Sequence, residues 1–496
     1  MRASALASVT LDCLITCEAV ASTTETLRRP ARMRETTYPG RWFLSPLVIP
    51  VAIALAGLFW LGTVKLEMSV TLCLLLMVQL ILFLLAFRRP VWAVAALLVG
   101  QVTASGYILY PTAGLGISVA LIWTLATILL LIPILAQKGV KVGSKAARVI
   151  IPAIIFFGLA TIANYLNTDI ADTFKYSRWT VTCIVILCLL PTMVQKERDL
   201  KLIGVVTLTI CTMSAIAAVL QHYYNVGGLA GDRSSGLSGS PILLGLELPL
   251  VLMAMLGVLL IGGLSSRLRI FLTIVGIVVG LGLIYTFTRS GVYSLAAGTL
   301  AMAMLLKGRI RYLLVLAVLI VGVAFLSYAC INNSRLTQLN EGSSAARLVL
   351  WDAGVKIALD HPLFGIGQYR FEQVSAGYAS KVDPRILDYL GAGANLGVKA
   401  VHNDFLRVWV CFGTPALLIF LWLIINIFRN FLYSYWHIKG RFLKGFVLGC
   451  TAGVIVYVIN AAVHNIMDSV FFLWILGGLS IVCSKLAMSE SAEEKE

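Results

Sequence analysis

Charged side chains are scarce in this sequence. Asp, Glu, Lys and Arg together make up 12% of the 496 residues, whereas 59% are hydrophobic and the mean hydropathy is +0.92. In a typical soluble protein about a quarter of the residues are charged, so this chain has too little charge to cover a surface that faces water. The composition excludes a soluble enzyme and predicts an all-α polytopic membrane protein.

Motifs that hold metals or nucleotides are missing as well. The sequence has no P-loop, no zinc-ligand spacing and no carboxylate-rich motif. We therefore expect neither a metal ion nor a cofactor. The net charge is +16, but the basic residues fall in small clusters between apolar runs. Such clusters are typical of topology signals, and nucleic acid is not an expected partner.

Long apolar runs recur along the chain. A helix needs about 20 apolar residues to cross the hydrocarbon core, and this criterion predicts twelve to fourteen transmembrane helices. The lower number counts helices joined by very short turns, such as the pair that flanks Arg289, as one broken element. We expect the spans near residues 43–63, 68–87, 91–110, 115–136, 148–165, 178–194, 201–221, 241–263, 270–288, 290–306, 311–329, 404–428, 444–460 and 467–485.

The basic residues also predict the topology. Lys and Arg in short connections stay on the cytoplasmic side, and most of them lie there if both termini are cytoplasmic. Residues 1–40 then form a cytoplasmic tail, which is either disordered or a misassigned leader, because Met33 is an alternative start. Residues 41–329 form an N-terminal transmembrane bundle, 330–403 a large outer loop, 404–485 the C-terminal transmembrane helices and 486–496 a cytoplasmic tail.

The outer loop should itself contain helix. Between Ala345 and Asp360 the apolar residues Leu348, Trp351, Val355 and Leu359 recur at helical spacing, which predicts a helix that lies against the membrane surface. Further along the loop, His361-Pro362 and the glycines Gly365 and Gly367 should form a turn that docks this helix.

Ionisable residues are nearly absent from the middles of the spans. Transporters place such groups there, and only Glu247, just before the kink expected at Pro249, is a clear exception. The candidates for chemistry instead gather at the outer ends of helices, where Arg233, Arg289, Arg347 and His402 lie. Planar guanidinium groups form bidentate hydrogen bonds to phosphate oxygens, so several of them at one membrane face favour a lipid diphosphate.

Each of these residues also has a purely structural interpretation. An arginine at a helix end can snorkel to the lipid headgroups, and Arg289 can pair with Glu247 or Asp468. A histidine in a loop is often only a surface residue, but His402 is followed by Asn403 and Asp404. Asp468 either orients His402 or pairs with an arginine, and Arg370 is either a phosphate contact or a solvated charge. Trp351 is a membrane-interface anchor or, less simply, a sugar-stacking surface.

Two stretches of this sequence resemble a known family. They are RLVLWDAGVKIALDHPLFGIGQYRF, from Arg347 to Phe371, and VHNDFLRVWVCFGTPALLIFL, from Val401. Together they resemble the signature of the O-antigen ligase and O-antigen polymerase superfamily. The upstream Thr288-Arg289-Ser290-Gly291 and Arg233-Ser234-Ser235-Gly236 elements are also similar to family features. The resemblance covers roughly residues 200–485. It departs from the family pattern after Arg233, where the family often has Asn-Pro-Asn and this chain has Gly239-Ser240-Pro241.

The resemblance implies a metal-independent, GT-C-like glycosyltransferase of the bacterial inner membrane, with its active site at the periplasmic face. Such an enzyme takes a glycan from undecaprenyl diphosphate and passes it to an acceptor hydroxyl, here lipid A-core in lipopolysaccharide biosynthesis. His402 is then the general base, while Arg289 and Arg347 hold the leaving diphosphate. Further contacts to the donor or acceptor are expected from Arg233, Arg370, Asn403, Asp404 and Asp468.

Other functions remain open at this point. A polymerase that joins O-antigen or exopolysaccharide repeat units uses the same lipid-linked donor, and so does an oligosaccharyltransferase that acts on proteins. A lipid-linked glycan flippase or transporter is the alternative from a different class. It should have a charged central cavity, which the charge-poor span centres argue against.

Overall fold

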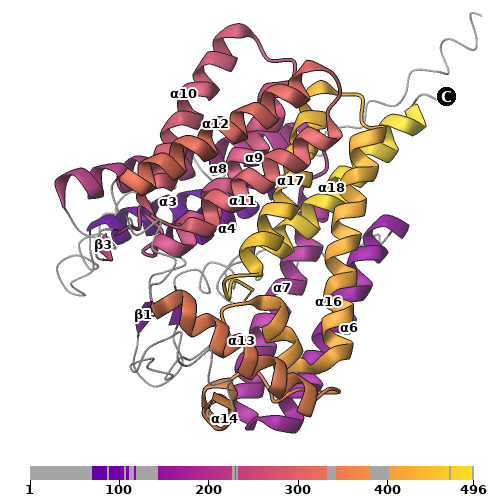
Figure 1. Cartoon of the computed structure of the whole chain (residues 1–496). Coiled ribbons are helices and arrows are strands. Elements are labelled where there is room, and N and C mark those ends of the chain that lie inside the picture. Colours follow the sequence, from indigo (N-terminus) through magenta and orange to yellow (C-terminus); the bar gives the residue numbers. More distant parts are fainter. Residues whose placement is uncertain are drawn as a thin grey trace, which may run out of the picture. The chain divides into compact units, whose positions relative to one another are not determined.

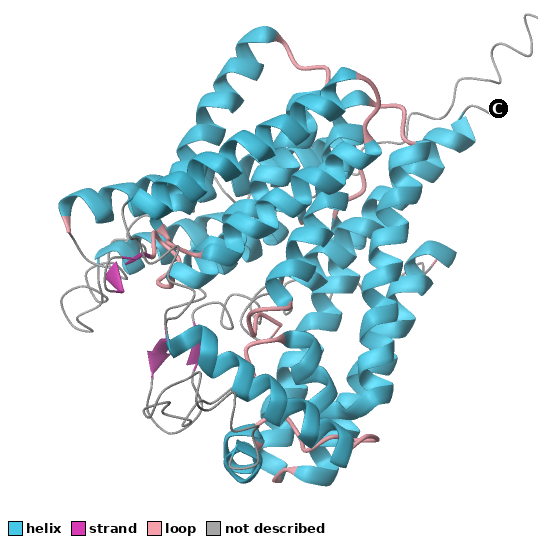
Figure 2. Cartoon of the chain, viewed as in Figure 1, coloured by secondary structure: helices cyan, strands magenta, loops and turns pink. Residues whose placement is uncertain are grey.

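The computed structural model describes residues 70–86, 89–104, 108–110, 117–118, 143–225, 229–230, 233–331, 342–379, 401–467 and 471–493. All of them belong to one compact unit, Ser69–Glu496. Helices dominate this part of the chain, and the strands form two short two-stranded pairings (Figures 1 and 2). The elements are α3 (Val70–Ala86), α4 (Val91–Ala104), β1 (Ile108–Tyr110), β2 (Ile117–Ser118), α6 (Ser144–Asn167), α7 (Ile170–Met193), α8 (Glu197–Tyr224), β3 (Leu229–Ala230), β4 (Arg233–Ser234), α9 (Pro241–Ile261), α10 (Ser266–Tyr285), α11 (Arg289–Leu305), α12 (Arg309–Ile331), α13 (Gly342–Asp360), α14 (Phe371–Ala379), α16 (Asp404–His437), α17 (Arg441–Ala461) and α18 (Phe472–Glu493).

The all-α membrane fold is confirmed. All the described helices except α13 and α14 coincide with predicted spans. Seven of them are long and apolar enough to cross a membrane, namely α6, α8, α9, α10, α16, α17 and α18. The number of spans and the domain boundaries remain predictions, because the span near 43–63 and the tail 1–40 lie outside the described residues.

Several predicted span boundaries differ from the structure. α4 ends at Ala104 rather than near 110, α7 begins at Ile170 rather than near 178, and α16 continues to His437 rather than ending near 428. The span expected from 115 does not begin there, because Ile117 and Ser118 pair as β2 with β1. The last span begins at Phe472 rather than near 467, and α18 continues to Glu493, beyond the expected end at 485. Apolar composition alone does not mark these boundaries, because it does not distinguish a strand or a connecting turn from the end of a helix.

The connections gather at two ends of the bundle. At one end, which we call the site end, Asp404 at the start of α16 accepts hydrogen bonds from the backbone just after α17. At the other, the far end, Asn430 near the end of α16 donates to the Lys145 carbonyl at the start of α6. The described residues 233, 289 and 402 all belong to connections at the site end, as the alternating helix directions require.

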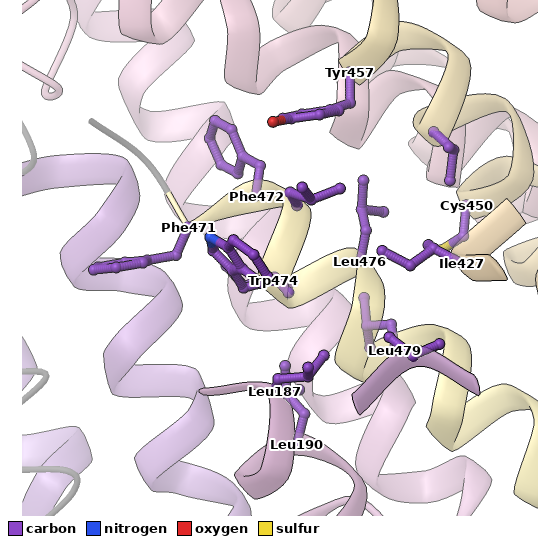
Figure 3. Close-up of a cluster of buried hydrophobic side chains, with 14 of the residues drawn as sticks. Leu187, Leu190, Ile427, Cys450, Tyr457, Phe471, Phe472, Trp474, Leu476 and Leu479 are labelled. Carbon is purple, nitrogen blue, oxygen red and sulfur yellow. The ribbon is translucent and has the colours of Figure 1, made fainter. Parts of the chain in front are cut away.

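An apolar and aromatic core joins the C-terminal helices to α7. Trp474 of α18 is fully buried and packs near Leu187 and Leu190 of α7, while Tyr457 and Cys450 of α17 line the other side (Figure 3). The Trp474 ring also lies 4.7 Å from the ring of Phe157 in α6, measured between centroids. This core fixes the bundle from which the site-end connections project.

Small residues bring α9 and α17 into close contact. A Cβ on Gly257 would overlap the Gly445 carbonyl, and a Cβ on Gly449 would overlap the backbone of Met253 and Ala254. Helices in a membrane gain stability from such close backbone approach, because there is little hydrophobic force between them. The packing holds the end of α9 against the start of α17, toward the far end of the bundle.

The helix predicted for Ala345–Asp360 is present as α13. Its buried face consists of Val349, Leu350, Ala353 and Ile357, and it packs on α14 and on the beginning of α16 (Figure 1). The apolar residues that predicted the helix lie on the other face, since Leu348, Val355 and Leu359 are exposed. The exposed face is the one available to a membrane surface, and that placement remains a prediction.

The glycine turn after α13 docks into a break in α16. Gly365 and Gly367 have positive φ angles of 59° and 82°, and Gly413 within α16 has a φ of 85°. The Ile366 and Gly367 amides donate to the carbonyls of Val410 and Cys411, each at 2.9 Å. The expected turn is therefore confirmed, and it fixes the end of α13 against α16.

We expect Gly413→Ala to destabilise the protein. Its positive φ is unfavourable for a residue with a Cβ, by about 1–3 kcal/mol, and the added Cβ would also overlap the Leu363 carbonyl. The thermal unfolding midpoint of the purified protein in detergent should fall by several degrees. Gly158→Ala in α6 is the matched control, because nothing lies within 4 Å of its added Cβ. Equal midpoints for the two variants would show that the docked turn does not support the fold.

Candidate functional site

The turn between α10 and α11 places Arg289 at the site end. Phe287 has a positive φ of 48°, which lets the chain reverse, and the Thr288 hydroxyl donates to the Pro241 carbonyl at 3.1 Å. A Cβ on Gly245 of α9 would overlap Thr288, so this turn is packed directly on the start of α9. Arg289 begins α11 from a fixed backbone and is half-buried.

Arg233 reaches across to the same turn from β4. Its Nε donates to the Thr286 carbonyl and its Nη2 donates to the Thr288 hydroxyl, both at 3.0 Å. These two bonds fix the orientation of the Arg233 guanidinium. Arg233 therefore stabilises the segment that precedes Arg289.

Arg347 approaches from α13. The indole N–H of Trp351, one turn further along, donates to the Val401 carbonyl at 3.0 Å, which ties α13 to the residue before His402. Partial burial lowers the pKa of Arg347, and the nearby charge of Arg289 lowers it further. The two guanidinium groups are thus close enough to repel each other, an arrangement that a bound anion would relieve.

His402 has a strained backbone between Val401 and α16. Its φ is 55°, in the left-handed region that residues other than glycine rarely adopt. The imidazole is half-buried and makes no hydrogen bond within the described part of the chain. Burial lowers its pKa and Arg347 lowers it further. His402 is therefore neutral near pH 7 and keeps a ring nitrogen able to accept a proton.

Asn403 and Asp404, expected to contact substrate, have structural partners. The Asn403 side chain accepts from the Leu406 amide and caps α16, while its own amide donates to the Asn465 side chain. Asp404 is fully buried, and its carboxylate accepts from the amides of Ile466 and Met467. These bonds hold the start of α16 against the turn that follows α17.

Two residues that were not among the predicted site residues join the site, His464 in this turn and Ser290 in α11. His464 is buried, and its Nε2 lies 2.8 Å from the Ser290 hydroxyl, directly after Arg289. Burial lowers the pKa of His464 to about 3, and the neighbouring Arg347, His402 and Arg233 add to this effect. The only sequence signal was a histidine at the outer end of a span, next to the predicted Asp468, which lies outside the described residues.

Two other predictions concern Glu247 and Arg370. Glu247 is fully buried and neither of its carboxylate oxygens has a hydrogen-bond partner, so the structural pairing of Arg289 with Glu247 is wrong. Arg370 is exposed and donates to the carbonyl of Asn167, the last residue of α6. It is not among the charges that lower the pKa of His402 or His464, and its role as a phosphate contact stays a prediction.

The structure therefore gathers five charged or titratable side chains from five separate segments. They are Arg233, Arg289, Arg347, His402 and His464, and electrostatic effects between neighbours link them. Three cations beside two neutral imidazoles can bind an anion and accept a proton next to it. Within the described ranges, no three His, Cys, Asp or Glu side chains are grouped as they would be around a metal ion.

His464 should make the stability of the fold depend on pH. Its pKa is about 3 in the folded protein and about 6.5 in the unfolded chain, so the unfolded chain binds more protons between these values. The stabilisation is complete above pH 6.5 and falls as the pH drops, by at most about 1.4 kcal/mol per unit. Thermal unfolding midpoints between pH 4.5 and 7.5 should therefore fall less for His464→Gln than for the wild type.

His437 provides the control, because it lies exposed at the far end. His437→Gln should keep the pH dependence of the wild type. If His464→Gln also keeps it, His464 is not held neutral by its surroundings.

One segment of the chain matches a known protein family. Residues 274–421 match the family described as O-antigen ligase, and this match supports the O-antigen ligase and polymerase superfamily. The matched segment runs from α10 into α16 and includes Arg289, Arg347 and His402, whereas Arg233 and His464 lie outside it. No curated protein matches the chain.

Proposed function

We propose that this membrane protein transfers a glycan from a polyprenyl diphosphate to an acceptor hydroxyl. The family match supports lipid-linked polysaccharide substrates in general. The finer assignment is an O-antigen ligase of the bacterial inner membrane that acts on undecaprenyl diphosphate and lipid A-core at the periplasmic face. The observation that carries it is the grouping of Arg289 and Arg347 with a neutral His402 inside the matched segment.

His402 is the general base in this proposal. A ring nitrogen takes the proton of the acceptor hydroxyl, the acceptor oxygen forms a bond to the anomeric carbon, and the bond from that carbon to the diphosphate oxygen breaks. The electron pair of the broken bond stays on the diphosphate. Because its pKa is lowered, His402 is free to accept a proton at neutral pH.

The arginines stabilise the leaving diphosphate. Arg289 and Arg347 neutralise the negative charge that forms on the diphosphate, and Arg233 supports them by holding the preceding turn. Ser290, hydrogen-bonded to His464, fixes the first residues of α11 beside them. His464 keeps this contact as a neutral imidazole, so it adds no further repulsion among the cations.

Lipopolysaccharide from a deletion strain tests this function. Loss of the gene should leave bare lipid A-core together with accumulated long polymer on its lipid carrier, because the donor is made but not transferred. The wild-type gene should restore polymer on the core. His402→Ala should not, since loss of a general base lowers such rates by about 10²–10⁴-fold, although the variant protein should still be inserted and folded.

Gel electrophoresis of this lipopolysaccharide also distinguishes between the competing functions. Core that carries a single repeat unit in the deletion strain indicates a polymerase. Full activity of the His402→Ala protein, at normal abundance in the membrane, would refute the role of His402 as the base. His361→Ala is the matched control, because His361 is an exposed imidazole in the glycine turn.

Transfer should persist in mild acid. A base works in its neutral form, and the pKa of His402 is below 6.5, so activity should fall only at a pH lower than that value. Arg347→Gln removes one of the two causes of the lowered pKa, so the residual activity should fall at a higher pH than in the wild type. Initial rates of purified protein from pH 4.5 to 8 measure both. If activity falls at the same pH in Arg347→Gln and in the wild type, His402 is not the titrating base.

A further inference from the structure

Three cations converge at the far end of the bundle, where α6 begins and α16 ends. Lys145 and Arg148 lie near the start of α6, and Arg429 lies on α16. The charges of Arg148 and Arg429 both act on the Lys145 ammonium group. The two helices are fixed together here, because the Asn430 side chain donates to the Lys145 carbonyl at 3.0 Å. The convergence is therefore built into the packing of the helices.

This arrangement is electrostatically unfavourable without a negative partner. Like charges repel, and cations near the beginning of a helix also oppose its dipole. The carboxylates described at this end have other partners: Glu197 pairs with Lys201, Asp199 accepts from the Lys196 amide and Glu490 accepts from the Lys439 amide. An anion between α6 and α16 would remove the repulsion.

Aromatic side chains place the cations at the level of lipid headgroups. The Lys145 ammonium lies 3.4 Å from the centre of the Tyr433 ring, and Trp436 on the same helix is exposed. Exposed Tyr and Trp near the ends of transmembrane helices typically lie at the membrane interface. The anion that reaches the three cations is thus at the depth of a phospholipid phosphate.

An exposed apolar strip continues from the cations along α6 and α16 toward the middle of the membrane. On α6, Ile151 and Ile155 follow Arg148 by three and seven residues, so they lie on the same helix face. On α16, Ile425 precedes Arg429 by four residues and lies on its face. Ile151 and Ile425 are 49% and 53% exposed. The two helices pack side by side and run in opposite directions (Figure 1), so both faces extend from the headgroup level toward the membrane centre.

We propose that the far end of α6 and α16 is a binding site for one anionic phospholipid. Lys145, Arg148 and Arg429 bind its phosphate, and the acyl chains lie along Ile151, Ile155 and Ile425. The apolar strip distinguishes this ligand from a soluble phosphate, which would gain nothing from it. Basic residues between helices at such a membrane face bind anionic headgroups by the same physics. The site lies at the opposite end from His402 and is independent of the transfer reaction.

Native mass spectrometry of the full-length protein tests the site. The protein is released from micelles that contain equal amounts of phosphatidylglycerol and phosphatidylethanolamine with identical acyl chains. The wild type should retain phosphatidylglycerol in at least about tenfold preference, since tenfold corresponds to about 1.4 kcal/mol. The variant K145Q/R148Q/R429Q should lose this preference while keeping the elution volume and unfolding midpoint of the wild type.

A matched variant, R267Q/R269Q/R309Q, removes three exposed arginines at the starts of α10 and α12. It should keep the preference, because these side chains are not grouped with Lys145. Equal loss in both variants would show general surface charge and overturn the site, as would an unchanged preference in K145Q/R148Q/R429Q. Displacement of the bound lipid by free glycerol phosphate would also overturn the proposal, since it would indicate a site for a soluble phosphate. If K145Q/R148Q/R429Q does not fold, loss of the preference in I151S/I425S supports the site and retention of it contradicts the site.

Discussion

The buried Asp404 carboxylate is the contact on which the site depends. It accepts hydrogen bonds from the amides of Ile466 and Met467 and so joins the start of α16 to the turn after α17. This junction places His402, before α16, and His464, after α17, beside the same arginines. Breaking such a buried contact leaves backbone amides without an acceptor, which costs more than losing an exposed hydrogen bond. The chemistry proposed for the imidazoles therefore rests on a carboxylate that itself takes no part in it.

The sequence predicts the helices well, because a membrane span needs a long apolar run that composition reveals directly. It also predicts the glycine turn, since Gly365 and Gly367 adopt positive φ angles that other residues avoid. The mutual arrangement of the site is harder to predict, because residues as distant as Ser290 and His464 meet only after the whole bundle packs. Asn403 is a further example: the same polar side chain can cap a helix or bind substrate, and only the fold shows that it caps α16.

The two ends of the bundle handle positive charge in different ways. At the site end, Arg233, Arg289 and Arg347 surround imidazoles whose pKa values are lowered, so charge and proton acceptor lie together. At the far end, Lys145, Arg148 and Arg429 border an exposed apolar strip on α6 and α16. The first arrangement suits a reaction at a diphosphate, whereas the second suits a lipid that stays bound.

A structure of the protein with undecaprenyl diphosphate in a lipid nanodisc would show whether Arg289 and Arg347 hold the diphosphate beside His402. We expect density for the diphosphate within about 3 Å of both guanidinium groups, with the end that bears the glycan in the donor facing His402. A diphosphate bound away from these arginines, or one with His402 on the opposite side of the bundle, would refute this arrangement.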